Sequence, residues 1–91
     1  MKLEIVPSNR FRKDLKIAQK RGMDLHKLEV VVEMLVLQMP LAAQHHDHRL
    51  SGNYSAFREC HIEPDWLLLY RQDEKELILF LFRTGSHSDL F

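Results

Sequence analysis

The sequence predicts an α+β domain in which two N-terminal helices pack on a twisted antiparallel sheet, in the order β-α-α-β-β-β. Two segments of helical period lie together near the N-terminus, and runs of strand character follow one another in the second half with short connectors. Helices grouped apart from a meander of strands are typical of this class. The chain has 91 residues, 45% of them hydrophobic, and is predicted to form one domain over residues 1–91.

The first two elements follow from residues near the N-terminus. Residues 2–6 (KLEIV) alternate and include β-branched side chains, so they predict a short strand that ends at Pro7. Ser8 is a suitable N-cap, and a helix is predicted from there to about Lys20, before Gly22. The apolar residues of this helix share one face, and its basic residues form a stripe on another arc, which comprises Arg10, Lys13, Lys16 and Lys20.

The second helix is unusually apolar. Asp24 can cap it, and it is predicted to run from Leu25 to Met39, where Pro40 ends it. Its apolar residues occupy more than one stripe, so the helix is expected either to lie within the core or to be covered by a partner. Residues 40–53 lack periodicity and end in turn-forming residues, which predicts a loop.

Three strands are predicted in the second half, at residues 54–62, 66–72 and 76–84. The connectors between them are short enough for two successive antiparallel hairpins. The pattern does not indicate where the first strand joins this sheet. The aromatic side chains of these strands, and a small cysteine, are expected to belong to the core: Phe57, Trp66, Tyr70, Phe80, Phe82 and Cys60.

Composition favours an intracellular protein. Cys60 is the single cysteine, so no intramolecular disulfide can form and a reducing compartment is expected. No secretory leader is visible, and no apolar stretch is long enough for a membrane span, so we expect a soluble cytoplasmic protein with no membrane association. The 13 basic and 13 acidic residues cancel, but six basic residues and one acid lie between Ser8 and Arg21. This segment could bind phosphates or could be a solvated helix face.

Titratable side chains are predicted to gather at one end of the sheet. His61 and Asp65 flank the first hairpin turn. The last strand runs antiparallel to the one before it, so Arg83 returns to the same end, and His87 follows four residues later. His48 lies in the preceding loop, which enters from the opposite end and reaches the group only if it folds back across the sheet.

This group contains the side chains needed to cut RNA. One of them can remove the 2′-OH proton, a second can protonate the departing 5′ oxygen, and a cation can stabilise the charge on the phosphorane. Imidazole suits either proton-transfer role because its ordinary pKa is about 6.5. Neither a metal nor another cofactor is expected.

The spacing of these residues leaves two other interpretations open. The segment 45-HHDH-48 is rich in potential zinc ligands, although the sequence has neither an HExxH motif nor paired cysteines. In a purely structural interpretation, His61 ends a strand, Asp65 closes its hairpin turn and His87 belongs to the C-terminal tail.

Four segments resemble the YafQ branch of the RelE-type toxins of bacterial type II toxin–antitoxin pairs: 13-KDLKIAQKRG-22, 47-DHRLSG-52, 57-FRECHIEPDWLLLY-70 and 83-RTGSHSDLF-91. They extend from the first helix to the last residue, and H-x-E-P-D-W with a terminal R-T-G-S-H-x-x-L-F is the most specific combination. The resemblance implies a RelE-like fold, in agreement with the predicted element order. It also implies an mRNA interferase, a ribosome-dependent endoribonuclease that cleaves mRNA in the ribosomal A site and inhibits translation.

The resemblance also implies which residues form the active site, and that the loop folds back to bring His48 to the others. We expect His48 or Asp65 to act as the base and His87 to act as the acid. His61 is expected to stabilise the transition state, together with Arg83, which we add on chemical grounds as a phosphate ligand. The C-terminal aromatic ring is expected to stack on a base. The implied positions are His48, His61, Asp65, His87 and Phe91.

The resemblance implies macromolecular partners as well. A cognate antitoxin is expected to inhibit the toxin, and the ribosome and mRNA are expected to bind it. The basic stripe with Lys13, Lys16 and Lys20 is the expected contact to ribosomal RNA. Zero net charge departs from the usual basic character of ribosome-binding toxins of this type. A ParE-like gyrase inhibitor on the same fold is the alternative, but that branch works without a histidine cluster.

Overall fold

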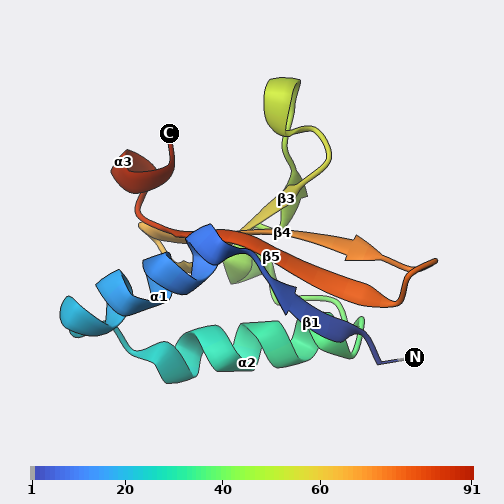
Figure 1. Ribbon diagram of the computed structural model, residues 1–91, viewed down its shortest axis with the longest axis horizontal. Coiled ribbons are helices and arrows are strands. Elements are labelled where there is room, and N and C mark those ends of the chain that lie inside the picture. Colours follow the sequence, from blue (N-terminus) through green and yellow to red (C-terminus); the bar gives the residue numbers. More distant parts are fainter. Residues whose placement is uncertain (1) are drawn as a thin grey trace.

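The computed structural model describes residues 2–91 as a five-stranded mixed sheet with two long helices on one face (Figure 1). The strand order in the sheet is β1-β5-β4-β3-β2. The α+β class and the predicted order of the main elements are confirmed. The elements are β1 (Glu4–Pro7), α1 (Asn9–Lys20), α2 (Leu25–Val36), β2 (His48–Arg49), β3 (Arg58–Glu63), β4 (Trp66–Asp73), β5 (Ile78–Gly85) and α3 (His87–Leu90), with short 3₁₀ turns η1 (Ala43–His45) and η2 (Gly52–Tyr54).

Both long helices begin at the predicted caps. The Ser8 hydroxyl accepts a hydrogen bond from the backbone N–H of Phe11, and the Asp24 carboxylate accepts one from the backbone of His26. Helix α2 ends at Val36, three residues before the predicted end. The chain turns there because Gln38 adopts a positive φ of 56°, so the helix stops before the proline.

The meander of β3, β4 and β5 is antiparallel, as predicted, but the sheet as a whole is not. Strand β1 pairs in parallel with β5, with Ile5 opposite Leu79. The prediction of a wholly antiparallel sheet is therefore wrong for this pair. Strand β1 lies at the edge of the sheet, next to β5. The two helices and the other strands come between β1 and β5 in the sequence, so no short turn joins the pair and constrains it to be antiparallel.

Three local predictions differ from the structure. The strand predicted over 54–62 begins only at Arg58, because η2 coils the preceding residues. The predicted loop contains the two-residue strand β2, whose His48 lies opposite Glu59 of β3. The C-terminal tail forms helix α3, which begins with a capping box between Ser86 and Asp89.

The main core lies between the sheet and the two long helices. Trp66, Tyr70 and Cys60 are buried there, as predicted, and burial raises the pKa of the Cys60 thiol. The prediction for the three phenylalanines is wrong, since Phe57, Phe80 and Phe82 are only half-buried and stack on one another outside this core. Their rings point to the opposite face of the sheet because side chains alternate along a strand.

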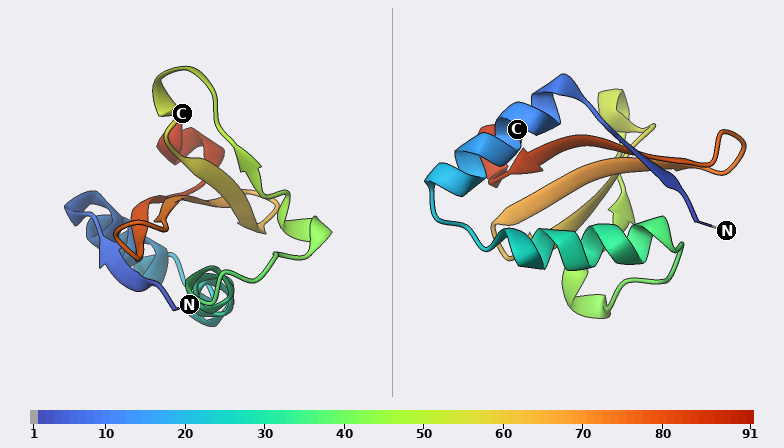
Figure 2. Two further views of the ribbon diagram at one scale, coloured as in Figure 1. Left: turned by 90° about the vertical axis from the view of Figure 1, so that its right-hand side faces the viewer. Right: turned by 60° about the horizontal axis from the view of Figure 1, so that its bottom comes forward.

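That opposite face carries two projections. Helix α3 and the segment around η2 both project from the side of the sheet opposite to α2 (Figures 1 and 2). We call this surface the open face of the sheet. No helix among residues 2–91 is both long enough and apolar enough to cross a membrane.

Candidate active site

A second, small apolar cluster supports the open face. Leu67 and Leu69 of β4 are buried on this side of the sheet, where Leu90 of α3 and Leu50 pack against them. The same two β4 residues lie opposite His61 and Glu59 of β3. The cluster therefore fixes α3 and the segment after β2 on either side of two polar side chains. Removing solvent from the leucines is the physical reason that these segments fold back over the sheet.

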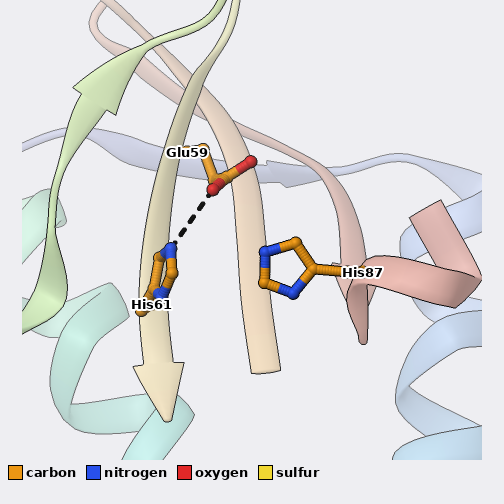
Figure 3. A group of neighbouring side chains, drawn as sticks. All are labelled: Glu59, His61 and His87. Carbon is orange, nitrogen blue, oxygen red and sulfur yellow. Dashed lines mark hydrogen bonds and ion pairs between the residues drawn. The ribbon is translucent and has the colours of Figure 1, made fainter. Parts of the chain in front are cut away.

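A buried carboxylate lies at the centre of the polar group. Glu59 is 6% exposed, and its Oε1 accepts a hydrogen bond from Nε2 of His61 at 3.2 Å. Nε2 of His48 lies 3.8 Å from the same oxygen. Strand β2 thus brings His48 to the group by pairing with β3, so that two imidazoles share one carboxylate. Figure 3 shows the Glu59 and His61 side chains on β3 with the imidazole of His87 facing them.

His87 provides the third imidazole, and Asp65, in the turn between β3 and β4, fixes its position. Asp65 accepts a hydrogen bond from Nδ1 of His87 at 2.6 Å and another from the backbone N–H of His87 at 3.0 Å. These two donors lower the pKa of the Asp65 carboxyl below its usual value. The His87 ring lies 5.8 Å from the His61 ring. Because Nδ1 is engaged with Asp65, Nε2 is the His87 atom available to a reacting group.

His46 and Asp47, in the segment just before β2, fix the position of His48. Nδ1 of His48 donates to the carbonyl of His46 at 2.6 Å, which leaves the lone pair of a neutral imidazole on Nε2, the atom near Glu59. Between these histidines, Asp47 accepts hydrogen bonds from the buried Tyr70 hydroxyl and from Nε of Arg58. The loop is therefore anchored through Asp47, and burial raises the pKa of the Tyr70 phenol well above its usual value.

Helix α3, which carries His87, is tied to the end of α1. Arg21 donates two hydrogen bonds to the Asp89 carboxylate, at 2.7 and 3.3 Å, and the backbone N–H of Ser86 donates to the same carboxylate at 2.9 Å. These donors, Arg21 first, hold the pKa of Asp89 well below its usual range. A Cβ atom at Gly85 would lie 3.0 Å from the Asp89 side chain, so any other residue would crowd Asp89.

Replacing Asp89 with asparagine is expected to lower the melting temperature at neutral pH by a few degrees. A carboxyl whose pKa is lowered on folding contributes stability above its unfolded pKa, about 3.9, and loses that contribution as the pH falls through the lower folded pKa. The melting temperature of the native protein should therefore fall more steeply below about pH 4 than that of Asp89→Asn. Thermal unfolding at stepped pH checks this, with Glu74→Gln in the exposed turn before β5 as the matched control. Equal slopes for native and Asp89→Asn proteins would contradict it.

The remaining predicted site residues lie elsewhere. Arg83 forms a bidentate ion pair with the buried carboxylate of Asp14 in α1, at 2.8 and 3.2 Å, rather than contacting the histidines. Phe91 is 59% exposed and its ring lies 5.9 Å from the ring of Tyr54 in η2. Exposed basic residues of the stripe lie along α1, on the helix-bearing side of the sheet: Lys13, Lys16 and Lys20.

The sequence prediction missed Glu59, the residue at the centre of the group. A signal was present, because Glu59 and His61 are two apart on a predicted strand and must share a face. The importance of the residue depends on β2, which brings His48 to it and was not predicted. His46, whose ring lies 5.3 Å from that of His61, was missed for the same reason.

The geometry also identifies which residues could hold a metal ion. One ligand atom each from Glu59, His61 and His87 lie within 4.8 Å of one another. Two imidazoles and a carboxylate are a donor set that suits zinc or copper. Among residues 2–91, the side chains placed to bind a metal ion are therefore those of Glu59, His61 and His87. The sequence alternative, a zinc site in 45-HHDH-48, does not correspond to this group.

Comparison with known proteins places this arrangement in a family. A family model described as the bacterial toxin of type II toxin–antitoxin systems, YafQ, matches residues 3–91. A protein of Escherichia coli strain K12 named mRNA interferase toxin YafQ is 40% identical over 89 residues, which are 97% of this chain and 95% of that protein. The chain belongs to the YafQ toxin family. The resemblance found in the four sequence segments is thereby confirmed.

Solved structures agree with the family assignment. The E. coli DinJ–YafQ toxin–antitoxin complex contains a chain that is 38% identical, with a TM-score of 0.90, over 100% of this chain and 99% of that one. A metal-bound toxin from Helicobacter pylori is 50% identical, with a TM-score of 0.92, over 98% and 99% of the two chains. The predicted RelE-like fold is therefore confirmed for this YafQ family member.

Proposed function

We propose that this YafQ family member is an endoribonuclease toxin that cleaves mRNA in the ribosomal A site without a metal ion, and that a cognate antitoxin inhibits it in the cytoplasm. The observation that carries the proposal is the pair of facing groups on the open face. Glu59 lies between His48 and His61 on one side, and His87 with its Asp65 partner lies on the other. The name mRNA interferase of the E. coli relative supports the substrate class.

From the geometry we propose proton-transfer roles for two imidazoles. Nε2 of His48 takes the proton of the 2′-OH, and the 2′ oxygen then attacks the adjacent phosphorus. Protonated His87 gives the Nε2 proton to the departing 5′ oxygen, with Asp65 as its counter-charge behind Nδ1. One proton is taken up and one is released, so the products are a 2′,3′-cyclic phosphate and a 5′-hydroxyl. His61, held by Glu59, faces the phosphorane between them.

Two assignments change from the sequence prediction. Asp65 was one of two candidate bases, but its two hydrogen bonds to His87 suit it better to orient the acid. Arg83 was expected to bind phosphate, but its partner in the structure is Asp14, so we now propose that it fixes α1 to β5. Phe91 keeps the proposed role of stacking on a base, because its ring is exposed at the end of α3.

A translating extract tests this proposal. Purified toxin is added to an extract that translates a defined message, and to the same message without ribosomes, and the new 5′ ends are mapped. We expect codon-phased cuts only in the presence of ribosomes. Equal cutting of the free message would overturn the ribosome-dependent part of the proposal. If the message stays intact and a parallel assay with DNA gyrase shows inhibited supercoiling, the ParE-like alternative would be supported instead.

Added zinc is expected to inhibit the cleavage rather than support it. Zinc bound by Glu59, His61 and His87 would occupy the nitrogen from which the acid donates its proton. Cleavage should therefore continue with a chelator, once the magnesium that ribosomes need is restored, and should fall by at least about 10-fold with saturating zinc. His26→Ala, on the exposed surface of α2, is the matched control and should remain equally sensitive to zinc. A requirement for zinc would contradict the metal-independent chemistry.

The basic stripe on α1 is proposed to contact ribosomal RNA. Reversing the charges of Lys13, Lys16 and Lys20 to glutamate is expected to weaken ribosome binding and to flatten its dependence on salt, since fewer counterions are released. Cosedimentation with ribosomes at several salt concentrations measures both effects. Lys75→Glu, in the turn before β5, is the control. Unchanged affinity and salt slope would assign the stripe to ordinary solvated surface.

The antitoxin is proposed to cover part of α2. Val30, Leu37 and Met39 are each between 43% and 50% exposed, on or just after a helix that is otherwise packed on the sheet. A partner that buries such side chains gains the hydrophobic free energy left unused in the isolated domain. The complex of the E. coli relative with DinJ supports the expectation of a protein antitoxin.

A further inference from the structure

The three half-buried phenylalanines form a continuous aromatic surface on the open face. The rings of Phe57 and Phe82 are stacked, with centroids 4.3 Å apart and an interplanar angle of 9°. The Phe80 ring lies beside this pair, 6.3 Å from Phe82 at an angle of 25° and 6.2 Å from Phe57 at an angle of 33°. None of the three is a fully buried residue of the main core or of the small leucine cluster. We call these three residues the phenylalanine row.

Arginines border the phenylalanine row. The guanidinium of Arg71 lies 5.7 Å from the centre of the Phe80 ring, in a cation–π contact. Arg49, Arg58 and Arg71 line a shallow hollow of about 420 Å³ together with Phe57. Arg58 forms an ion pair with Asp47, and Arg71 forms one with Asp73. The described polar contact of the Arg49 guanidinium is with a backbone carbonyl, that of Ser55. The surface therefore combines aromatic rings with the Arg49 guanidinium, which has no carboxylate partner among the described ion pairs.

The phenylalanine row begins close in the chain to Glu59, the buried carboxylate beside His48 and His61. Phe57 lies just before β3 and two residues before Glu59, and its ring stacks on that of Phe82 on the open face. On the other side, the Tyr54 ring lies 6.4 Å from Phe82 and 5.9 Å from Phe91. Ring contacts thus connect Phe91, at the C-terminus, to the phenylalanine row through Tyr54.

We propose that the phenylalanine row, with Arg49 and Arg71, binds a single-stranded segment of the RNA substrate beside the scissile bond. Bases would stack on the ring faces while the guanidinium groups contact the phosphates. The inference rests on the proposed RNA cleavage and extends its binding site along the sheet. Single-stranded RNA fits this surface better than a protein segment does, because base stacking and phosphate contacts use the two kinds of side chain present.

A binding experiment with a short single-stranded RNA tests this site. Methoxy groups at every 2′ position prevent cleavage, and fluorescence anisotropy gives the Kd. Phe57→Leu and Phe80→Leu retain apolar volume but lose the ring, and each should raise the Kd about 10-fold. Arg71→Gln should raise the Kd and lower the salt slope by about 1. Lys75→Gln, in the turn before β5, is the matched charge control and should bind as the native protein does.

An abasic RNA distinguishes stacking from an indirect structural effect. The native protein should bind it more weakly than the normal RNA, and Phe57→Leu should then cause no further loss, because the ring has no base to contact. Equal losses with both RNAs would overturn the stacking interaction. Thermal unfolding of each variant verifies that it is folded at the assay temperature.

The outcome of this experiment is separate from that of the proposed function. Cleavage at saturating RNA should keep its kcat in Phe57→Leu while KM rises about 10-fold. If the native protein cuts no RNA and the variants still weaken RNA binding, the proposed function fails and this site stands. If cleavage depends on His87 but the variants bind RNA normally, this site fails. Normal RNA binding with lost antitoxin binding would also overturn it, by assigning the surface to the antitoxin.

Discussion

Replacing His87 with alanine is expected to lower the rate constant for RNA cleavage about 10³-fold, which lies within the range for loss of a positioned general acid. The 5′ oxygen would then leave without a proton from Nε2, while the Asp65 carboxylate would remain behind an empty position. Since His87 is more than half exposed, the loss should come with little change in the free energy of unfolding. Single-turnover cleavage of ribosome-bound message measures the rate constant directly.

Two further variants make this result specific. His26→Ala removes an exposed imidazole from α2 and should leave the rate unchanged. Asp65→Asn keeps the shape of the turn but removes the counter-charge, so it should lower the rate less than His87→Ala and alter the pH profile of cleavage. If His87→Ala cut message at the native rate, the assignment of the acid would be wrong.

Replacing Asp14 with alanine is expected to destabilise the fold by about 3 kcal/mol. Asp14 is 6% exposed and accepts hydrogen bonds from Nε and Nη2 of Arg83 and from the backbone N–H of Thr84. Its loss leaves a largely buried guanidinium and a buried N–H without their partner, which is costlier than losing both members of the pair. Urea unfolding of the native and variant proteins measures the difference. Asp24→Ala, which removes only the exposed cap of α2, should cost about 1 kcal/mol.

A double variant then separates the two roles considered for Arg83. The double variant Asp14→Leu, Arg83→Met should be more stable than Asp14→Ala, because it buries no unpaired charge. If Arg83 is structural, this variant should also cut RNA at a rate near that of the native protein. Recovered stability with a cleavage loss as large as that of His87→Ala would restore the phosphate-binding role predicted from the sequence.

The order of elements could be predicted because each depends on nearby residues. Ser8 and Asp24 are caps that act on the next two or three backbone groups, and Pro64 lies in the turn between two strands of clear character. The antiparallel meander brings His61, Asp65 and the start of α3 to one end of the sheet, so part of the candidate site also follows from the sequence.

The remaining features depend on contacts between distant residues. Strand β1 pairs in parallel with β5 across almost the whole length of the chain, and no local pattern encodes the direction of such a pair. The position of His48 depends on the two-residue strand β2 and on the Asp47–Tyr70 contact. The phenylalanines of β5 alternate with buried leucines, so periodicity separates two faces but does not show which face is exposed.

In the proposed mechanism, the 2′-OH of the RNA is the nucleophile and imidazoles move the protons. The chemical groups at the cut ends distinguish this mechanism from attack by water. Message recovered from ribosomes after toxin treatment is examined for the groups on both sides of each cut, with and without a chelator. We expect 2′,3′-cyclic phosphates and 5′-hydroxyls in both samples, formed about 10³-fold more slowly with His87→Ala. Cuts that carry 3′-hydroxyls and 5′-phosphates, formed by attack of water, would contradict it.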